Sequence, residues 1–160
     1  MKSTQLIIIG NAQIEMENFL CTVLQSHFIS EGISFNTLIH NDVRFNIWHV
    51  AKDFEDFNTI QHLLHHMNII IYSVDIDNAT KLVGNIQALM SKFKAVQLFM
   101  ETQNTRQEDY IQFANQFQLE SIHFELGSYK SAAAVLDKVI QMYNNQVANT
   151  IQQFKSKLFK

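Results

Sequence analysis

The sequence predicts an α/β domain in which a mostly parallel sheet of six strands is covered by helices on both faces and is followed by an extended C-terminal helix. Short apolar runs of strand type alternate with longer segments in which apolar residues recur every three to four positions. This alternation is typical of α/β domains. The 160 residues, 47% of them hydrophobic, suffice for one domain with a substantial core.

Each element follows from its own pattern. Residues 5–9 and 68–74 are strongly apolar, as expected of buried strands. The Asn-Asp turn signal at 41–42 lies between two alternating runs, 33–37 and 43–47, which predicts an antiparallel hairpin with one buried face. The remaining strands are predicted at 95–100 and 121–126, and the helices at 13–28, 54–66, 79–93, 107–117 and 129–159.

The composition excludes several classes of function. A net charge of −3 offers no basic field to nucleic acid, and no stretch approaches the roughly 20 apolar residues of a membrane-spanning helix. The one cysteine, Cys21, excludes an internal disulfide and a cysteine-rich zinc site. Since the N-terminal apolar run is too short for a signal peptide, the chain is expected to be soluble and intracellular.

Glycine is scarce in this chain. There are four glycines, Gly10, Gly32, Gly84 and Gly127, and no proline. A phosphate-binding loop needs glycines where backbone amides approach the ligand. The composition therefore leaves little material for such a loop.

Five stretches carry local patterns whose order along the chain is informative. They are 6–12 (Leu-Ile-Ile-Ile-Gly-Asn-Ala), 45–52 (Phe-Asn-Ile-Trp-His-Val-Ala-Lys), 69–75 (Ile-Ile-Ile-Tyr-Ser-Val-Asp), 113–117 (Phe-Ala-Asn-Gln-Phe) and 123–128 (His-Phe-Glu-Leu-Gly-Ser). In order, they resemble five parts of the Ras-like small GTPases. These parts are the first strand with its phosphate loop, the third strand with its Trp-Asp-Thr-Ala-Gly segment, the fourth strand with its acidic residue, the fifth helix-loop region and the Glu-Thr-Ser-Ala-Lys stretch.

The resemblance extends to the order of the predicted elements, which is strand, loop, helix, hairpin, helix and then three strand–helix pairs. It implies a three-layer P-loop or Ras-like fold. It also implies a degenerate small-GTPase-like domain over residues 1–146, with residues 147–160 as an extension of the last helix.

The phosphate-loop positions have lost their chemistry. A working loop reads Gly, four residues, then Gly-Lys-Ser or Gly-Lys-Thr, and its lysine contacts the β and γ phosphates. Counting from Gly10 places Glu15, Met16 and Glu17 at the last three positions. The lysine charge is absent, and two carboxylates lie where the triphosphate would be. Each like-charge contact at about 4 Å costs ~1–4 kcal/mol near a protein surface.

The switch and base-recognition positions depart in the same way. The aspartate that reaches Mg²⁺ aligns with His49, and the switch glycine aligns with Lys52. The segment nearest to the guanine motif is 101–104, where Asn104 replaces the aspartate that reads the base. The resemblance therefore implies a pseudo-GTPase with no catalytic residue, no cofactor and no metal.

Three smaller features allow a functional and a structural interpretation. His62 and His66 are spaced as a metal-binding pair on a helix, but an exposed polar face is favoured. Glu15 and Glu17 form a conceivable acid–base pair, but carboxylates that complement a helix N-terminus are favoured. Trp48 is either a packing residue or an anchor for a partner, and the sequence leaves both open.

The last predicted helix carries one apolar stripe over about six turns. The stripe consists of Leu136, Ile140, Tyr143, Val147, Ile151, Phe154 and Leu158. Its first half is expected to pack on the sheet. Its second half, Val147, Ile151, Phe154 and Leu158, is predicted to overhang and to bind a protein partner.

A membrane surface is the alternative for this helix, helped by Lys155, Lys157 and Lys160. No cysteine stands near position 160 for prenylation, so no lipid anchor is expected.

These features predict a non-catalytic pseudo-GTPase that serves as a structural or scaffold subunit of a larger protein assembly. By fold-level analogy the favoured settings are a cytoskeletal or ciliary complex, axoneme included, or a trafficking complex, with a mitochondrial assembly left open. The alternative is a GTPase-like protein with residual, atypical nucleotide binding. A receiver-like module would need an acidic cluster at the strand ends and a late lysine, which the sequence does not show.

Overall fold

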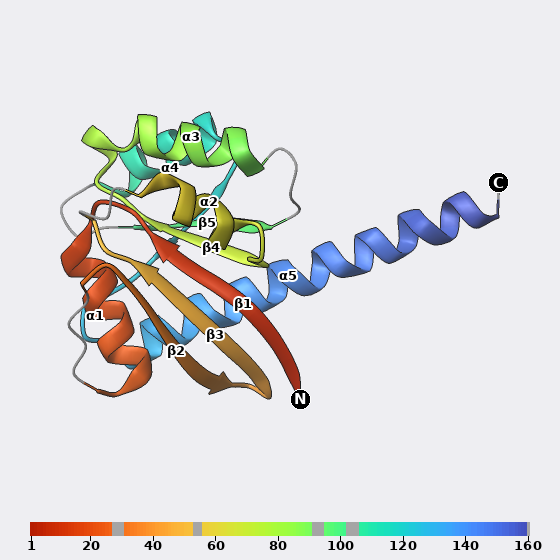
Figure 1. Ribbon diagram of the computed structural model, residues 1–160, viewed down its shortest axis with the longest axis horizontal. Coiled ribbons are helices and arrows are strands. Elements are labelled where there is room, and N and C mark those ends of the chain that lie inside the picture. The colour runs from red at the N-terminus through yellow and green to blue at the C-terminus, as the bar shows by residue number, and fades with distance from the viewer. Residues whose placement is uncertain (27–30, 53–55, 91–94, 102–105, 160) are drawn as a thin grey trace.

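The computed structural model describes residues 1–26, 31–52, 56–90, 95–101 and 106–159 (Figure 1). Its strands are β1 (Lys2–Ile9), β2 (Ile33–His40), β3 (Val43–Val50), β4 (Ile69–Ser73), β5 (Val96–Glu101) and β6 (Glu120–His123). Its helices are α1 (Gln13–Leu24), α2 (Phe57–Leu64), α3 (Thr80–Met90), α4 (Gln107–Gln116) and α5 (Tyr129–Leu158), with a short 3₁₀ helix, η1, at Ile76–Asn78. The α/β class, the six-stranded sheet and the long last helix are confirmed.

The sheet is mixed, and this corrects the prediction of a mostly parallel sheet. The strand order is β2-β3-β1-β4-β5-β6. The strand β1 pairs in parallel with both β3 and β4, and β4-β5 and β5-β6 are also parallel. The pair β2-β3 is antiparallel because a tight turn joins the two strands. Asn41 and Asp42 form that turn with positive φ angles of 48° and 62°, as the primed hairpin turns require.

The hairpin does not have the single buried face that its alternation predicts. In the observed register Phe35 lies opposite Trp48, whereas Phe45 lies opposite Leu38. Phe35 and Phe45 therefore point to opposite faces of the sheet, since successive side chains of a strand alternate. Each strand has its own period of two, but only the pairing register relates the two strands to each other.

Two hydrophobic cores hold the three layers together. One face of the sheet packs against α1 and α5, around residues such as Phe19 and Val135. The other face packs against α2, α3 and α4, around residues such as Ile60, Val83 and Phe113. The short strand β4 is buried along its whole length between them, which is why its sequence is apolar without alternation.

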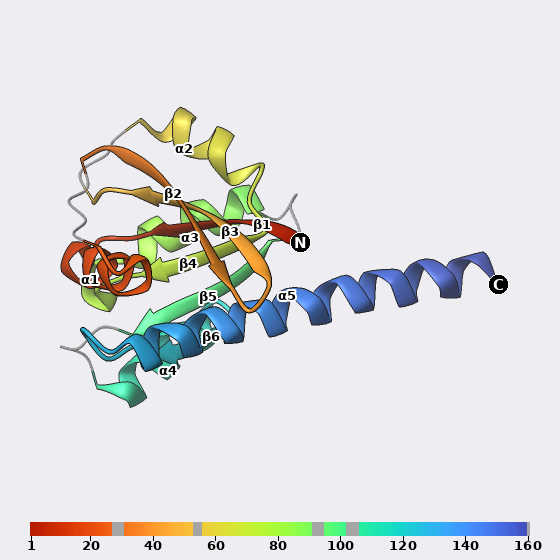
Figure 2. The ribbon, with the colours of Figure 1, turned by 90° about the horizontal axis from the view of Figure 1, so that it is seen from below.

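The helix α5 begins on the sheet and continues far beyond it (Figures 1 and 2). At 30 residues it is about 45 Å long. Lys2 at the start of β1 contacts its middle part: the Lys2 ammonium donates to Asn144 Oδ1 at 2.7 Å and lies 5.0 Å from the centre of the Tyr143 ring.

The observed elements agree with the predicted ones to within a few residues, with two qualifications. The helix η1 was not predicted, because one turn capped by the Asp75 carboxylate leaves no periodic signal. The ends predicted at 25–28, 54–56 and 91–93 fall wholly or partly outside the described residues. No helix within the described ranges is both long and apolar enough to cross a membrane.

Candidate functional site

The candidate site is the edge of the sheet at the carboxyl ends of β1, β3 and β4. The strand β1 lies between β3 and β4, so the chain connections leave it in opposite directions. Ligands of doubly wound sheets bind at such a switch point. The residues that the resemblance places in the degenerate nucleotide site all lie on elements that meet here: Gly10, Glu15, Met16, Glu17, His49 and Lys52.

The loop between β1 and α1 is only three residues long, because β1 ends at Ile9 and α1 begins at Gln13. A phosphate loop has four residues between its two glycines, and its amides wrap the phosphates. Here the loop packs against the end of β4. Ala12 N–H donates to the Ser73 carbonyl at 3.1 Å, and a Cβ on Gly10 would lie 1.8 Å from the same oxygen. The end of β4 therefore takes one backbone donor of the loop and the space beside Gly10.

Asn and Gln side chains hold this edge of the sheet together by hydrogen bonds to the backbone. Three backbone N–H groups donate to them: Asp75 to Asn11 Oδ1 at 2.6 Å, Lys52 to Gln13 Oε1 at 2.8 Å and Gly127 to Asn18 Oδ1 at 2.7 Å. Gln13 Nε2 in turn donates to Glu17 Oε1 at 2.8 Å. These contacts tie α1 to the chain after β3 and to the loop before α5, and they tie the loop between β1 and α1 to the chain after β4. Sequence reasoning missed them, because an Asn or Gln side chain has no preferred partner until the fold supplies one.

Glu15, Met16 and Glu17 all lie in the first part of α1, and they do not converge on the loop. Met16, which the resemblance aligns with the phosphate-loop lysine, is fully buried in the core between α1, α5 and the sheet. Glu15 and Glu17 are half-buried. Because helical neighbours are about 100° apart, the helix that directs Met16 into the core directs the two carboxylates away from it.

His49 lies near the end of β3, on the face that α1 covers, and is 1% exposed. Burial lowers the pKa of this imidazole to about 4, because a charged ring loses its hydration, and the nearby Glu17 carboxylate partly opposes the shift. His49 is therefore neutral at physiological pH. A neutral buried ring in this position contributes to packing between β3 and α1.

The depressed pKa of His49 predicts acid sensitivity. The unfolded chain binds this proton near pH 6.5 and the folded chain only near pH 4. The free energy of unfolding should therefore fall as the pH drops from 6.5 to 4, by at most about 3.5 kcal/mol, at about 1.4 kcal/mol per pKa unit. Urea unfolding at several pH values measures this loss. His49→Gln should flatten the slope, and exposed His62→Gln should leave it unchanged. Equal slopes for His49→Gln and the parent would contradict the assignment.

The residues that the resemblance assigns to the switch and base-recognition positions also make contacts within the fold. Lys52 is exposed, and its backbone N–H is the donor to Gln13. Glu101 is buried at the end of β5, where it accepts a hydrogen bond from Ser121 Oγ at 3.3 Å and lies 3.6 Å from His123 Nδ1. The rest of the predicted base-recognition segment, 102–104, lies outside the described residues.

The structure shows the surroundings of the conceivable histidine pair, His62 and His66. His62, His65 and His66 are exposed on and just after α2, on the outer side of that helix. Among the described residues, no group of three or more His, Cys, Asp and Glu side chains is placed to hold a metal ion.

Trp48 is half-buried on the sheet face that α2 partly covers. Its indole N–H donates to Gln5 Oε1 at 3.2 Å, and its ring centre lies 4.7 Å from that of Phe35. Phe35 itself is half exposed. Trp48 therefore packs through one side and borders an open surface on the other.

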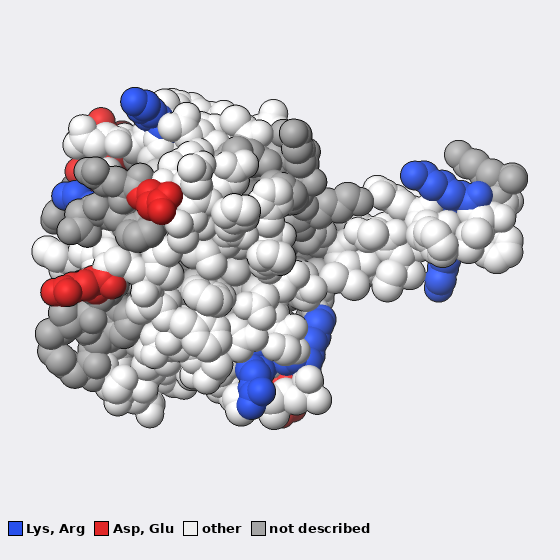
Figure 3. Space-filling view, in the orientation of Figure 1, with Lys and Arg blue, Asp and Glu red and all other residues white. Residues whose placement is uncertain are grey.

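The four predicted partner-binding residues are all exposed on the far part of α5. Val147, Ile151, Phe154 and Leu158 are 36, 50, 64 and 62% exposed. Every residue from 147 to 159 is exposed, and the space-filling view shows lysine but no acidic residue on this part of the helix (Figure 3). We call residues 147–158 the overhang.

No described protein family matches the chain, and no curated protein sequence matches it.

Proposed function

We propose that this protein is a non-catalytic pseudo-GTPase that acts as a structural or scaffold subunit of a larger protein assembly. The observation that carries the proposal is the position of Met16. The residue that aligns with the phosphate-binding lysine is fully buried in the core, so its side chain cannot reach a ligand at the sheet edge.

The three-residue loop supports the same proposal. The end of β4 occupies the space beside Gly10, and the amide side chains of Asn11 and Gln13 accept hydrogen bonds from the surrounding backbone. The element order also supports it, because it is the order on which the resemblance to small GTPases rests. In this proposal the chain has the fold of a small GTPase but neither binds nor hydrolyses a nucleotide.

The overhang supports the scaffold role. The four apolar side chains of its stripe are 36 to 64% exposed, and an exposed apolar stripe on a helix is typical of a protein-binding segment. The assemblies that we favour are cytoskeletal, ciliary or trafficking complexes, by fold-level analogy alone.

Isothermal titration with GTP and GDP in the presence of Mg²⁺ tests the first half of the proposal. We expect no heat of binding, because the loop offers the phosphates neither a lysine nor a cradle of amides. Micromolar binding of either nucleotide would instead favour the alternative, a GTPase-like protein with an atypical site.

Purification of the tagged protein from its native cells tests the second half. We expect a defined set of subunits to co-purify with the parent chain. The full-length variant Ile151→Gln/Phe154→Gln/Leu158→Gln should lose them, since glutamine keeps the helix but removes the stripe. Exposed Ile111→Gln on α4 is the control.

A further inference from the structure

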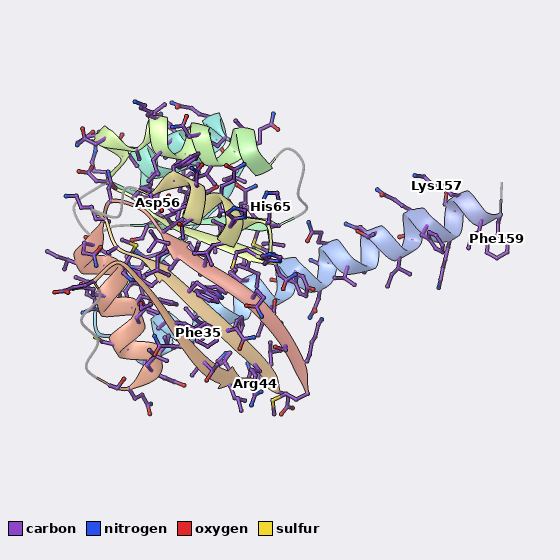
Figure 4. All side chains as sticks on the ribbon, viewed as in Figure 1. Phe35, Arg44, Asp56, His65, Lys157 and Phe159 are labelled. Carbon is purple, nitrogen blue, oxygen red and sulfur yellow. The ribbon has the colours of Figure 1, made fainter. Side chains whose placement is uncertain are left out.

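A second apolar surface lies on the β2-β3 hairpin, on the opposite side of the sheet from α5. It is formed by Phe35, Ile39, Arg44 and Trp48, which we call the hairpin face. By the register of the strands, Phe35 lies opposite Trp48 and Ile39 opposite Arg44. Phe35 and Ile39 are 50 and 55% exposed. Figure 4 shows Phe35 and Arg44 on strands that no helix covers in this view.

This surface has the composition of a protein interface. Trp, Tyr and Arg are the residue types most often found at binding hot spots. In a three-layer α/β domain, helices normally cover both faces of the sheet. On this side α2 packs by way of Ile60 and Leu64 near Val50, and the described helices leave the outer part of the hairpin open.

The overhang is long enough to act as the helix that is missing from this open face. It is a helix of twelve residues, about 18 Å long, and the strands of the hairpin, at eight residues each, span about 26 Å. A helix with one apolar stripe is the element that covers a sheet face elsewhere in this fold. The overhang cannot cover the hairpin face of its own chain, because α5 packs on the other side of the sheet and points away from it (Figure 2).

The charges of the two parts are complementary. Residues 147–160 contain three lysines and no acidic residue, which leaves nine basic and fifteen acidic residues in the rest of the chain. Lys155 and Lys157 flank the stripe of the overhang on its two sides. Glu31, two positions before β2, and Asp56, six positions after β3, are exposed, as is Lys52. The two carboxylates outnumber this one lysine near the hairpin end closer to Phe35, so a helix running along the hairpin can place its lysines at that end.

We propose that the overhang of one chain docks, stripe inward, on the hairpin face of a second copy. The proposal rests on the proposed function, in which the overhang is the docking element, and it names the partner. Such a contact joins two different surfaces, so a pair of chains keeps one free face and one free overhang. Repetition then builds a ring or an open filament.

Trp48 provides a direct test, because it is the only tryptophan of the chain. Sedimentation velocity of the full chain, from low to high micromolar concentration, should show species larger than a monomer. In the same samples the fluorescence of Trp48 should shift to the blue as the hairpin face is covered. Phe154→Gln should weaken the association constant at least about tenfold, as the loss of one buried aromatic anchor does, and should abolish the shift. Ile111→Gln should do neither.

A mixing experiment identifies the two surfaces. The face variant Phe35→Thr/Ile39→Thr keeps its overhang, and the overhang variant Ile151→Gln/Phe154→Gln/Leu158→Gln keeps its face. Each variant alone should be monomeric, whereas the mixture should form a one-to-one complex that grows no further. Circular dichroism of each variant checks that it is folded.

Other outcomes would overturn the proposal. Association that survives in the face variant without a shift of Trp48 would mean that overhangs pair with each other. A chain that stays monomeric but binds vesicles of phosphatidylcholine and phosphatidylserine through its overhang would mean a membrane partner. A monomer that does neither, yet co-purifies with other subunits through its overhang, would refute self-docking and leave the proposed function standing. If the overhang variant co-purified with the same subunits as the parent chain, the docking role of the overhang would be refuted.

Discussion

Replacing Gly10 with alanine is expected to lower the free energy of unfolding by about 2–6 kcal/mol. Two costs add up at this position. The φ angle of Gly10 is +156°, which L-residues rarely adopt and which costs about 1–3 kcal/mol. The new Cβ would lie 1.8 Å from the Ser73 carbonyl oxygen and 2.6 Å from its carbon. Backbone atoms cannot rotate away as a side chain does, so β1 and β4 must separate, at about 1–3 kcal/mol more.

A second glycine provides the matched control for this prediction. Gly84 lies inside α3, and a Cβ there would meet nothing within 4 Å. Gly84→Ala should therefore raise the free energy of unfolding by about 0.5–1 kcal/mol, through helix propensity. Chemical denaturation of both variants measures the contrast. If Gly10→Ala stayed within about 0.5 kcal/mol of the parent, the tight contact between the loop and β4 would be refuted.

Met16→Lys is expected to destabilise the protein by more than about 3 kcal/mol and to create no nucleotide binding. The substitution restores the lysine of the phosphate-loop pattern at the aligned position. The side chain there is fully buried among Phe19, Leu20 and the other residues of the core under α1. An ammonium group at this position has no counter-ion and must lose its hydration or its proton.

Two further substitutions separate charge from shape. Met16→Leu keeps the volume and should cost less than about 1.5 kcal/mol. Glu15→Lys puts the same charge at a half-buried position one residue away, and should cost less than about 1 kcal/mol, mainly through the helix dipole. Denaturant unfolding and titration with GTP and Mg²⁺ measure both quantities. A stable Met16→Lys variant that binds GTP would contradict this prediction, because it would mean that Met16 alone prevents nucleotide binding.

The His49 result would complement these variants. Gly10 tests the contact between β1 and β4, Met16 tests the core beneath α1, and His49 tests the packing of β3 against the same helix. Together the three positions probe whether the sheet edge is a closed, structural unit. A nucleotide site would require at least one of these contacts to open.

The sequence by itself determined the elements of this fold. Burial on both faces makes a strand wholly apolar, and burial on one side gives a helix its 3.6-residue period, so β4 and α5 could be placed from their patterns alone. The resemblance to small GTPases aligns Met16 with the lysine of a phosphate loop, and the loss of that chemistry stays a prediction. The prediction of the overhang also needed a comparison of lengths, because α5 is longer than the surface that a domain of this size offers it.

Only the tertiary structure decided how these elements meet. Phe35 was expected on the buried face of the hairpin, but its pairing with Trp48 places it on the open side. The bonds from Asn11, Gln13 and Asn18 to backbone N–H groups join segments up to 109 positions apart. Strand register and long-range polar contacts depend on which segments become neighbours, and local periodicity carries no information about that. The closed sheet edge and the two exposed apolar surfaces are therefore properties of the fold.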